Sequence, residues 1–423
     1  MESNLEKVLI VGIELPDDII DIETSMDELQ ELVKAAEGVV VSRVIQKREK
    51  INSAYFIGKG KAFEIKNYCD ELDIATVVFN DELTGAQIRN LETTINRKIV
   101  DRTNLILDIF ASRARSNEGK LQVKLAQLKY RLPRLIGFRD YLSRTGGGIG
   151  TRGPGEQKLE TDRRHILREI DNIEEQLKEV EKNRSVKRKK REDSSLPIVS
   201  LVGYTNAGKS TLLNKLIEFK DEKEEKKYVY VEDMLFATLD TSLRRSRLPN
   251  GQAFLISDTV GFVSKLPTRL IEAFKGTLEE VNYSDLLIHV VDASSKDLDI
   301  QLNTTMEILK DLEVLDKPII TVFNKMDKVD ISNLIYDNKL VDNKIFVSAR
   351  YDIGLDKLMK LIEELLPQKY KEVTLKIPFD EQGLVNYFMN NYEVKNIDYV
   401  EEGTLLEFAI NQIDYEKYKT YMV

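Results

Sequence analysis

Four short segments of this chain follow one another in an order that few folds allow. The first spells Gly-Tyr-Thr-Asn-Ala-Gly-Lys-Ser over residues 203–210, directly after the apolar run 198–202. The others are Asp-Thr-Val-Gly at 258–261, Asn-Lys-Met-Asp at 324–327 and Ser-Ala at 348–349. A strand that ends in such a glycine-rich loop and continues as a helix places backbone N–H groups around a phosphate. Together the segments predict a doubly wound α/β domain with its ligand at the carboxyl ends of the strands.

Phosphate contacts are predicted for the first segment. Glycine lets the backbone wrap closely around a phosphate, and the helix expected after the loop adds the positive end of its dipole. We expect the Lys209 ammonium to reach the β- and γ-phosphates of a nucleotide and the Ser210 hydroxyl to bind Mg²⁺. The residues predicted to bind phosphate are Gly203, Tyr204, Thr205, Asn206, Ala207, Gly208, Lys209, Ser210 and Thr211.

The second segment predicts a sensor of the terminal phosphate. Asp258 follows the expected strand 253–257 and lies 49 residues after Lys209, a separation that favours a carboxylate holding a Mg²⁺-bound water. Gly261 can donate its backbone N–H to the γ-phosphate, so that this stretch responds when that phosphate leaves. The predicted switch residues here are Asp258, Thr259, Val260, Gly261 and Phe262.

The third and fourth segments predict which base is bound. The Asp327 carboxylate can accept hydrogen bonds from both N1–H and N2–H₂ of guanine, whereas adenine would leave this buried charge unpaired. We expect Lys325 to pack over the base, Asn324 to tie this loop to the phosphate loop, and Ala349 to donate its backbone N–H to guanine O6. The predicted guanine-binding residues are Asn324, Lys325, Asp327, Ser348, Ala349 and Arg350.

A first switch is expected between residues 227 and 246. Thr238 is the candidate for a second protein ligand of Mg²⁺, with Thr241 and Ser242 as alternatives. The predicted switch residues in this stretch are Phe236, Ala237 and Thr238. The predicted Mg²⁺ ligands are Ser210, Thr238 and, through a water, Asp258. The residues predicted to act in catalysis are Lys209, Thr238 and Gly261.

Several side chains near these segments bear on how hydrolysis is completed. Phe262 stands where a Ras-like GTPase has a glutamine, and a phenyl ring cannot orient water by hydrogen bonding. We therefore expect slow turnover until a partner completes the site. Asn206 has two interpretations, because it either holds a K⁺ ion that acts where an arginine finger would, or stabilises the turn of the loop. Arg244, Arg245 and Arg247 are either an arginine finger in cis or exposed residues of a strand.

The composition limits the class of protein. With 42% hydrophobic and 32% charged residues, the chain is expected to be globular, and its 423 residues suggest two to three domains. No run reaches the roughly 18 apolar residues that span a bilayer, and the N-terminal residues lack a signal-peptide pattern. The single Cys69 argues against disulfides and thiolate zinc sites, and only His165 and His289 are available for a histidine site. We expect a cytoplasmic protein without a membrane partner.

Residues 111–195 carry the excess of basic charge. They hold 22 Lys and Arg against 13 Asp and Glu, a local charge of +9, whereas the whole chain carries −9 and the remainder therefore −18. Apolar residues recur with heptad spacing over 121–135 and again over 159–180. The glycine-rich stretch 146–155 separates the two seams. We predict an antiparallel helical hairpin with this stretch as its tip loop, the alternative being two amphipathic helices that lie on a core.

The remaining regions read as two smaller α/β segments. Strands are expected at 8–11, 39–41, 76–79, 374–378 and 404–410, and helices near 26–36, 84–95 and 383–390. The stretch Gly-Lys-Gly-Lys at 58–61 is expected to be a loop, and the basic run 187–191 a solvated linker. The predicted domains are 1–110, an N-terminal α/β domain with a partly parallel sheet; 111–195, the hairpin with glycine-rich loop 144–156 and the basic linker; 196–370, the GTPase domain; and 371–423, a small α+β domain.

These features resemble the HflX family of ribosome-associated GTPases over nearly the whole chain. The most distinctive match is Gly-Gly-Gly-Ile-Gly-Thr-Arg-Gly-Pro-Gly-Glu at 146–156, between two heptad helices and directly before the nucleotide domain. Phe262 and the stretch Phe-Ala-Thr-Leu-Asp at 236–240 fit the family as well. Thr241-Ser242 departs from it, because a proline-containing sequence is expected there.

The resemblance implies a GTPase that binds the large (50S) ribosomal subunit in its GTP state, inserts its hairpin near the peptidyl-transferase region and splits stalled or stressed 70S ribosomes. The basic segment suits contacts with rRNA phosphates, and arginines can also stack on bases. The predicted ribosome contacts are Arg144, Gly146, Gly147, Gly148, Arg152 and Gly153. The alternative is a GTP-timed RNA-binding scaffold for assembly or quality control of the 50S subunit. GTP and GDP are the expected ligands, and the free protein is expected to be a monomer.

Overall fold

The computed structural model describes residues 5–18, 20–145, 154–192, 196–218, 243–259, 261–265, 270, 281–334, 336, 341, 343–366, 370–392 and 394–423. These residues belong to two compact units. The first contains the described residues up to 182 together with 261–265 and 270, and the second contains those of 183–259 and from 281 onward. Both units are mixed α/β, which confirms the predicted fold class. Among the described residues, no helix has the length and apolar character needed to cross a membrane.

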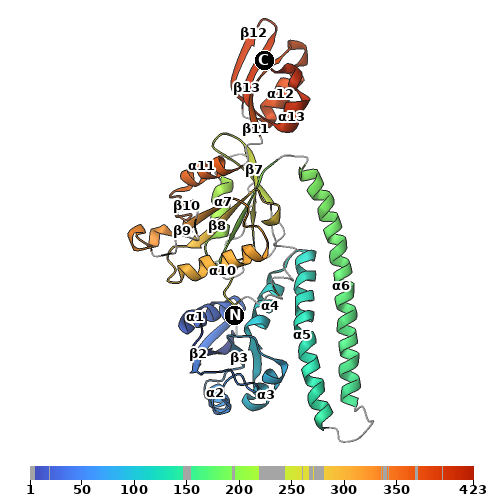
Figure 1. Cartoon of the computed structure of the whole chain (residues 1–423), viewed down its shortest axis with the longest axis vertical. Helices are drawn as coiled ribbons and strands as arrows, with labels where there is room; N and C mark the ends of the chain where they lie inside the picture. Colours follow the sequence, from blue (N-terminus) through green and yellow to red (C-terminus); the bar gives the residue numbers. More distant parts are fainter. Residues whose placement is uncertain are drawn as a thin grey trace. The chain divides into compact units, whose positions relative to one another are not determined.

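A parallel sheet of four strands, in the order β2-β1-β3-β4, organises the first unit (Figure 1). Its elements are β1 (Glu6–Glu14), α1 (Ile22–Ala35), β2 (Gly38–Lys47), α2 (Lys59–Glu71), β3 (Thr76–Phe79), α3 (Gly85–Ile95), β4 (Lys98–Asp101) and α4 (Arg102–Arg113). Successive residues of a strand face opposite sides, so Val8 and Ile10 of β1 join the core with α1 and α4, whereas Leu9 and Val11 join the core with α2 and α3. The sheet is therefore buried on both faces.

The beginning of α2 differs from the sequence prediction. Gly58 precedes the helix, and Lys59, Gly60 and Lys61 form its first turn, so the predicted loop at 58–61 is wrong. The Lys61 ammonium lies 2.7 Å from the Glu64 carboxylate one turn later, a pair that favours the helix. The sequence analysis also missed β4 and α4, which are short or lack a clear amphipathic period.

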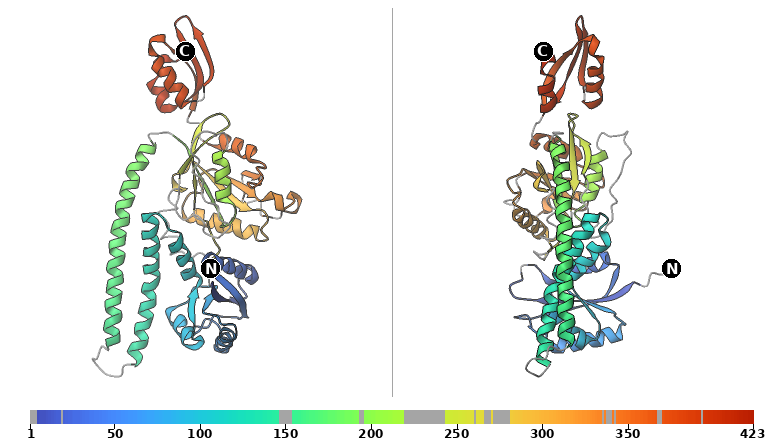
Figure 2. Two further views of the ribbon diagram at one scale, coloured as in Figure 1. Left: turned by 180° about the vertical axis from the view of Figure 1, so that it is seen from behind. Right: turned by 90° about the vertical axis from the view of Figure 1, so that its right-hand side faces the viewer.

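The predicted hairpin is formed by α5 (Asn117–Thr145) and α6 (Pro154–Glu192), which lie side by side in opposite directions (Figures 1 and 2). Their shared core contains Leu125 and Leu128 from α5 and Ile170 and Ile173 from α6. This is the heptad seam expected from the sequence. Helix α6 continues to Glu192, so the basic run 187–191 is helical where the sequence suggested a linker.

The middle of α5 is fixed to the end of β4. Asp101, whose side chain is fully buried, accepts a hydrogen bond from the Tyr130 hydroxyl of α5. The Arg134 guanidinium, one turn further along α5, lies 2.9 Å from the same carboxylate and 3.3 Å from the centre of the Tyr130 ring. Burial and the neighbouring Asp101 raise the pKa of Tyr130 well above its usual range, so its proton stays available to Asp101. The hairpin is thus held by a buried, charge-assisted contact.

A short segment from far along the chain completes the core of the first unit. Val263 is fully buried in the cluster that contains α1 and α4. Beside it, the backbone N–H and the hydroxyl of Ser264 donate to the Glu28 carboxylate. The Arg102 guanidinium donates to Glu28, to Oδ1 of Asn80 at 2.9 Å and to the carbonyl oxygen of Ser264 at 3.1 Å. A buried ion pair is tolerated only with such additional hydrogen bonds.

A sheet of six strands, in the order β10-β9-β8-β5-β7-β6, forms the centre of the second unit. Its strands are parallel except β6, which pairs antiparallel with β7 at one edge. The elements are β5 (Ile198–Gly203), α7 (Lys209–Glu218), β6 (Leu243–Arg247), β7 (Ala253–Asp258), β8 (Leu286–Asp292), α10 (Leu298–Asp311), β9 (Ile319–Asn324), η1 (Met326–Lys328), η2 (Ile331–Asn333), β10 (Asn343–Phe346) and α11 (Leu355–Leu365). Helices α7 and α11 cover one face and α10 the other.

The last part of the second unit is a small α+β fold, as predicted. It contains β11 (Tyr370–Ile377), η4 (Phe379–Glu381), α12 (Gln382–Asn391), β12 (Val394–Val400), β13 (Gly403–Asn411), α13 (Gln412–Lys417) and η5 (Lys419–Tyr421). The antiparallel order is β11-β13-β12. Rings of Phe388, Phe408 and Tyr418 meet in its core, with Phe388 and Phe408 centroids 5.0 Å apart. The sequence analysis missed β12 and α13.

We predict that Glu28→Ala destabilises the first unit by about 3–5 kcal/mol, because it leaves the buried Arg102 guanidinium without its counter-charge. Amide hydrogen exchange of β1 and α4 in the full chain measures the effect. Glu31→Ala is the control, since the Glu31 carboxylate forms only an exposed pair with Lys34 at 3.6 Å and should contribute less than about 1 kcal/mol. Equal protection in the two variants would contradict this account of the buried pair.

Candidate nucleotide-binding site

The four sequence segments meet at one edge of the six-stranded sheet. Residues 203–210 follow the central strand β5, 258–261 begin at the last residue of β7, 324–327 at the last residue of β9, and 348–349 follow β10. The carboxyl ends of parallel strands lie at the same edge, where ligands of open α/β sheets bind. Residues that are far apart in the sequence therefore surround one position.

The phosphate loop requires glycine at two positions. Gly203 and Gly208 have φ angles of 141° and 92°, which side chains rarely allow. A Cβ atom at Gly203 would lie 2.2 Å from the Val290 carbonyl oxygen, and one at Gly208 would lie 2.3 Å from Nδ2 of Asn324. Asn206 also has a positive φ, of 59°, a conformation that asparagine tolerates better than most residues. The loop is thus fixed both by backbone conformation and by close packing.

Lys209 is held inside this loop. Its ammonium donates to the carbonyl oxygens of Gly203 at 3.0 Å and Tyr204 at 2.7 Å. Burial lowers the pKa of Lys209 to about 8, although the nearby Asp258 carboxylate opposes that shift. Charged phosphate oxygens in the loop would be stronger acceptors than these carbonyls.

Ser210 and Asp258 form a pair of oxygen ligands suited to Mg²⁺. The Ser210 hydroxyl donates to Oδ2 of Asp258 at 2.7 Å, and Asp258 is fully buried. Hydroxyl, carboxylate and phosphate oxygens are the ligands that Mg²⁺ takes in nucleotide sites. The residues present therefore fit a Mg²⁺ ion, with Ser210 as a direct ligand. Thr238, the other candidate ligand, lies outside the described residues.

Asn324 links three of the four segments. Its Nδ2 donates to the Ala207 carbonyl oxygen at 2.9 Å, and its Oδ1 accepts from the Ala349 backbone N–H at 3.0 Å. The next residue, Lys325, has a φ of 64°, and its ammonium lies 2.7 Å from Asp292. The sequence analysis did not single out Asp292, although its place at the end of the strand 286–291 could have indicated it.

The Asp327 carboxylate is prepared to act as an acceptor. The Ser348 hydroxyl donates to its Oδ1 at 2.5 Å, and this hydrogen bond lowers the pKa of Asp327. An ionised carboxylate accepts hydrogen bonds only, which is what two donors on the guanine edge require. Arg350 is exposed beside this loop, with its guanidinium 5.7 Å from the Tyr351 ring centre.

The structure reveals an uncharged histidine behind the phosphate loop. His289 of β8 is fully buried, and in the described part of the chain neither ring nitrogen has a hydrogen-bond partner. Burial lowers the pKa of His289 to about 3, and repulsion from the Lys209 ammonium adds to the shift. The ring is therefore neutral at ordinary pH. Sequence reasoning did not mark it as functional, because it is one polar residue in an otherwise apolar strand.

Among the described residues after Asp258, the side chains of Thr259, Ser264 and Lys265 already form hydrogen bonds, and Phe262 carries no polar group. The Thr259 hydroxyl donates to the Leu201 carbonyl oxygen at 2.6 Å. Phe262 is only 1% exposed. Several predicted site residues lie outside the described part of the chain. They are the switch residues Phe236, Ala237, Thr238 and Val260, the tip residues Gly146, Gly147, Gly148, Arg152 and Gly153, and the side chain of Arg144.

Two of the three arginines considered for catalysis lie away from the phosphates. Arg247 pairs with Ala253 and Arg245 with Leu255 across the β6–β7 ladder. Ala253 lies five residues before Asp258 on β7, which is about 16 Å along the strand. An arginine side chain at position 247 is too short to reach from there to Asp258. These two residues fit the strand interpretation.

Three protein-family models match this chain in succession. They are described as "GTP-binding GTPase N-terminal" (residues 23–111), "GTP-binding GTPase Middle Region" (residues 113–191) and "50S ribosome-binding GTPase" (residues 198–325). Together they span most of the sequence.

Curated relatives match over nearly the whole length. The GTPase HflX of Caldanaerobacter subterraneus subsp. tengcongensis is 46% identical, covering 98% of this chain and 93% of the relative. The GTPase HflX of Escherichia coli K12 is 38% identical over 93% of this chain and 92% of the relative. Among solved structures, a GTP-binding protein from Sulfolobus solfataricus in complex with GDP matches with 26% identity and a TM-score of 0.44, covering 85% of this chain and 98% of that one.

We predict that Asp327→Asn lowers affinity for GTP by about 10- to 100-fold and raises affinity for XTP. An asparagine amide donates to the C2 carbonyl of xanthine but cannot accept both guanine donors. Competition by GTP and XTP against a fluorescent nucleotide measures both affinities. Asp330→Asn is the control, because Asp330 only caps a short helix through the Ser332 N–H at 3.2 Å. Unchanged GTP affinity in Asp327→Asn would refute the base-reading role.

We predict that His289 makes the protein less stable as pH falls below 6.5. The unfolded chain binds a proton at this residue near pH 6.5, whereas the folded chain does so only near pH 3. At pH 5 this costs about 2 kcal/mol. His289→Leu should flatten the fall in stability between pH 7 and pH 5. Denaturant unfolding of this variant and of the wild type at the two pH values tests this, and an equal fall in both would exclude it.

Proposed function

The chain belongs to the HflX family of GTPases, and we propose that it is a GTP-controlled factor that binds the 50S ribosomal subunit and splits stalled or stressed 70S ribosomes. That it hydrolyses GTP follows from its family and nucleotide domain. One observation carries the ribosomal part of the proposal. A basic helical hairpin directly precedes a domain that matches a family described as 50S ribosome-binding GTPases.

The hairpin is built to present its tip to a distant partner. The seam around Leu128 and Ile173 packs the two helices together, and Asp101 holds the middle of α5 through Tyr130 and Arg134. Helices that are already packed lose less conformational entropy when they bind. The local charge of +9 over residues 111–195 suits rRNA phosphates. We place the rRNA contacts at the tip, with Arg144 and Arg152 as the cationic residues.

The covalent chain supports a link between the nucleotide and the first unit. Asp258 ends β7 of the second unit, and five residues later Val263 lies in the core of the first unit. In our proposal, Gly261 contacts the γ-phosphate between these two points. Loss of that phosphate would let Gly261 move, and this movement would be passed to Val263 and Ser264, which Glu28 and Arg102 hold by hydrogen bonds. GTP hydrolysis would in this way control how the hairpin unit is held on the ribosome.

Catalysis in this proposal depends on a partner. Lys209 neutralises charge on the β- and γ-phosphates, and Ser210, Thr238 and a water on Asp258 hold Mg²⁺, which supplies further charge neutralisation when bound. Phe262 is buried and cannot orient the attacking water. We therefore propose slow turnover that the 50S subunit accelerates. A K⁺ ion at Asn206 is the second source of positive charge that we propose.

The cellular location and the ligands that we propose follow from these partners. A ribosome-binding GTPase acts in the cytoplasm, takes GTP and releases GDP, and meets the 50S and 70S particles through rRNA; we propose that it is monomeric when free. The same contacts would serve a GTP-timed scaffold for assembly or quality control of the 50S subunit. The two functions differ in whether 70S particles come apart.

We predict that purified 50S subunits increase the GTP turnover of the full chain and that deleting residues 144–156 removes this increase while leaving basal turnover intact. The deletion shortens the tip and spares the nucleotide site. Phosphate release, measured with and without 50S, gives both rates, and running it in KCl and in NaCl tests the K⁺ proposal. Stimulation that survives the deletion would show that the contact surface lies elsewhere. Equal rates in the two salts would exclude K⁺.

We further predict that the protein with a slowly hydrolysed GTP analogue converts 70S particles into 30S and 50S particles in a sucrose gradient. The GDP-bound protein is the control and should leave 70S intact. Intact 70S particles at saturating protein and analogue, with 50S binding preserved, would support the scaffold function instead.

A further inference from the structure

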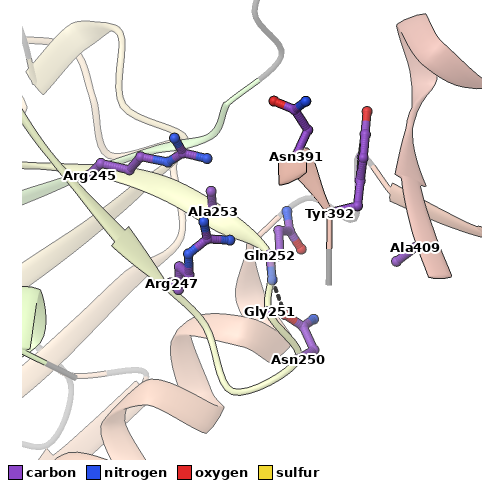
Figure 3. A pocket seen from close by; sticks show the side chains of 9 residues that line it. All are labelled: Arg245, Arg247, Asn250, Gly251, Gln252, Ala253, Asn391, Tyr392 and Ala409. Carbon is purple, nitrogen blue, oxygen red and sulfur yellow. Dashed lines mark hydrogen bonds between the residues drawn. The ribbon is translucent and has the colours of Figure 1, made fainter. Parts of the chain in front are cut away.

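A cleft in the second unit is lined by hydrogen-bond donors that have no acceptor among the described residues. It lies at the end of β7 opposite the nucleotide-binding end. It lies between the β6–β7 turn and the end of α12, and its lining includes Arg245, Arg247, Asn250, Gln252, Asn391 and Tyr392 (Figure 3). We call it the arginine cleft. None of its described lining residues carries a carboxylate. It thus has positive charge with no counter-charge in its own lining.

The two arginines project to the same side of an edge strand. Arg245 and Arg247 are two residues apart on β6, so their side chains share one face. Figure 3 shows both guanidinium groups directed to the side where Gln252, Asn391 and Tyr392 lie. Within the described part of the chain, neither guanidinium forms a hydrogen bond or an ion pair. Arginine is the side chain best suited to bind two oxygens of one phosphate.

Gln252 provides an independent sign of a missing ligand. It is only 8% exposed, and its Nε2 has no hydrogen-bond partner among the residues that the structure describes. A buried amide left in this state costs about 1–3 kcal/mol. Its backbone is fixed by the turn, since its N–H donates to Oδ1 of Asn250 at 2.9 Å and its carbonyl accepts from the Leu248 N–H at 2.9 Å. The backbone of Gln252 is thus fixed, and its amide is a donor without an acceptor among the described residues.

The other polar groups of the cleft are already used. Nδ2 of Asn391 donates to the Tyr387 carbonyl oxygen at 2.8 Å, and the Tyr392 hydroxyl donates to Asp414. The donors that remain are the two guanidinium groups, the Gln252 amide and Nδ2 of Asn250. This set fits an anionic group with several oxygens and does not fit a cation or an apolar ligand.

We propose that the arginine cleft binds a phosphate group of an RNA backbone, as a second RNA contact besides the hairpin. The choice of RNA rests on the proposed function, which gives the protein a large RNA partner. The donor set itself rests on the cleft. No base contact is required, so this contact adds affinity and orientation without sequence specificity.

The experiment compares Arg245→Gln/Arg247→Gln with Lys357→Gln/Lys360→Gln. The control pair removes the same charge from exposed positions of α11 outside the cleft. Fluorescence anisotropy of a labelled single-stranded uridine oligonucleotide, measured with the full chain over a range of salt, gives affinity and its salt dependence. The arginine variant should bind about 10-fold more weakly, and its log–log salt slope should fall by about 0.7 for each phosphate that is no longer neutralised. Indistinguishable variants overturn the proposal.

Gln252→Met separates a ligand-binding role from a structural one. Methionine has a similar volume and no unsatisfied donor, so the unfolding temperature should stay the same or rise while oligonucleotide affinity falls. A lower unfolding temperature with unchanged affinity would overturn the proposal. Competition by poly-glutamate as strong as that by unlabelled uridine oligonucleotide would also overturn it, in favour of an acidic protein partner.

The proposal for the arginine cleft and the proposed ribosomal function can fail separately. Co-sedimentation of the wild-type chain with 50S subunits tests the proposed function, and the oligonucleotide titration tests the cleft. A chain that fails to sediment with 50S but shows the arginine-dependent salt slope would refute only the proposed function. Normal sedimentation with no difference between the arginine and lysine variants would refute only the cleft.

Discussion

The buried pair between Glu28 and Arg102 is the interaction on which the rest of this structure depends. A guanidinium that is only 2% exposed is tolerated in a protein core only when its charge and its donors are matched. Glu28 supplies the charge, and Ser264 supplies acceptors to Arg102 and donors to Glu28. The segment around Ser264 comes from beyond β7, so the core of the first unit is complete only when this distant segment occupies it.

That requirement limits how the chain after Asp258 can move. Ser210 donates to Asp258 at one end of this stretch, and Val263 is buried at the other. Between them lies Gly261, the residue that we propose contacts the γ-phosphate, and its movement requires either a small displacement or the release of Val263 and Ser264. Packed cores switch between discrete arrangements more readily than they deform. The few residues between Asp258 and Ser264 thus favour an all-or-none response over a gradual one.

The sequence predicted what local chemistry determines and missed what long-range packing determines. The loop glycines and the linking hydrogen bonds of Asn324 could be predicted because each is set by residue type and by position after a strand, whereas the base-reading role of Asp327 stays a prediction. The hairpin could be predicted because heptad spacing is a local period. Nothing local indicated that Glu28, Arg102 and Ser264 would meet, since they lie 236 residues apart at the extremes. The helical start at 58–61 was missed because two glycines outweighed the Lys61–Glu64 pair.

The two RNA contacts that we propose also differ in whether the local sequence indicates them. The hairpin could be inferred from charge, because its basic residues are concentrated in one stretch of sequence. The arginine cleft could not, because Arg245 and Arg247 read equally well as exposed strand residues, and Gln252 carries no charge. What marks the cleft is an energetic cost. A buried amide without an acceptor destabilises the folded chain, and the turn at Asn250 fixes the backbone that carries it. A donor kept in place at a cost to stability is better explained by a ligand than by the fold.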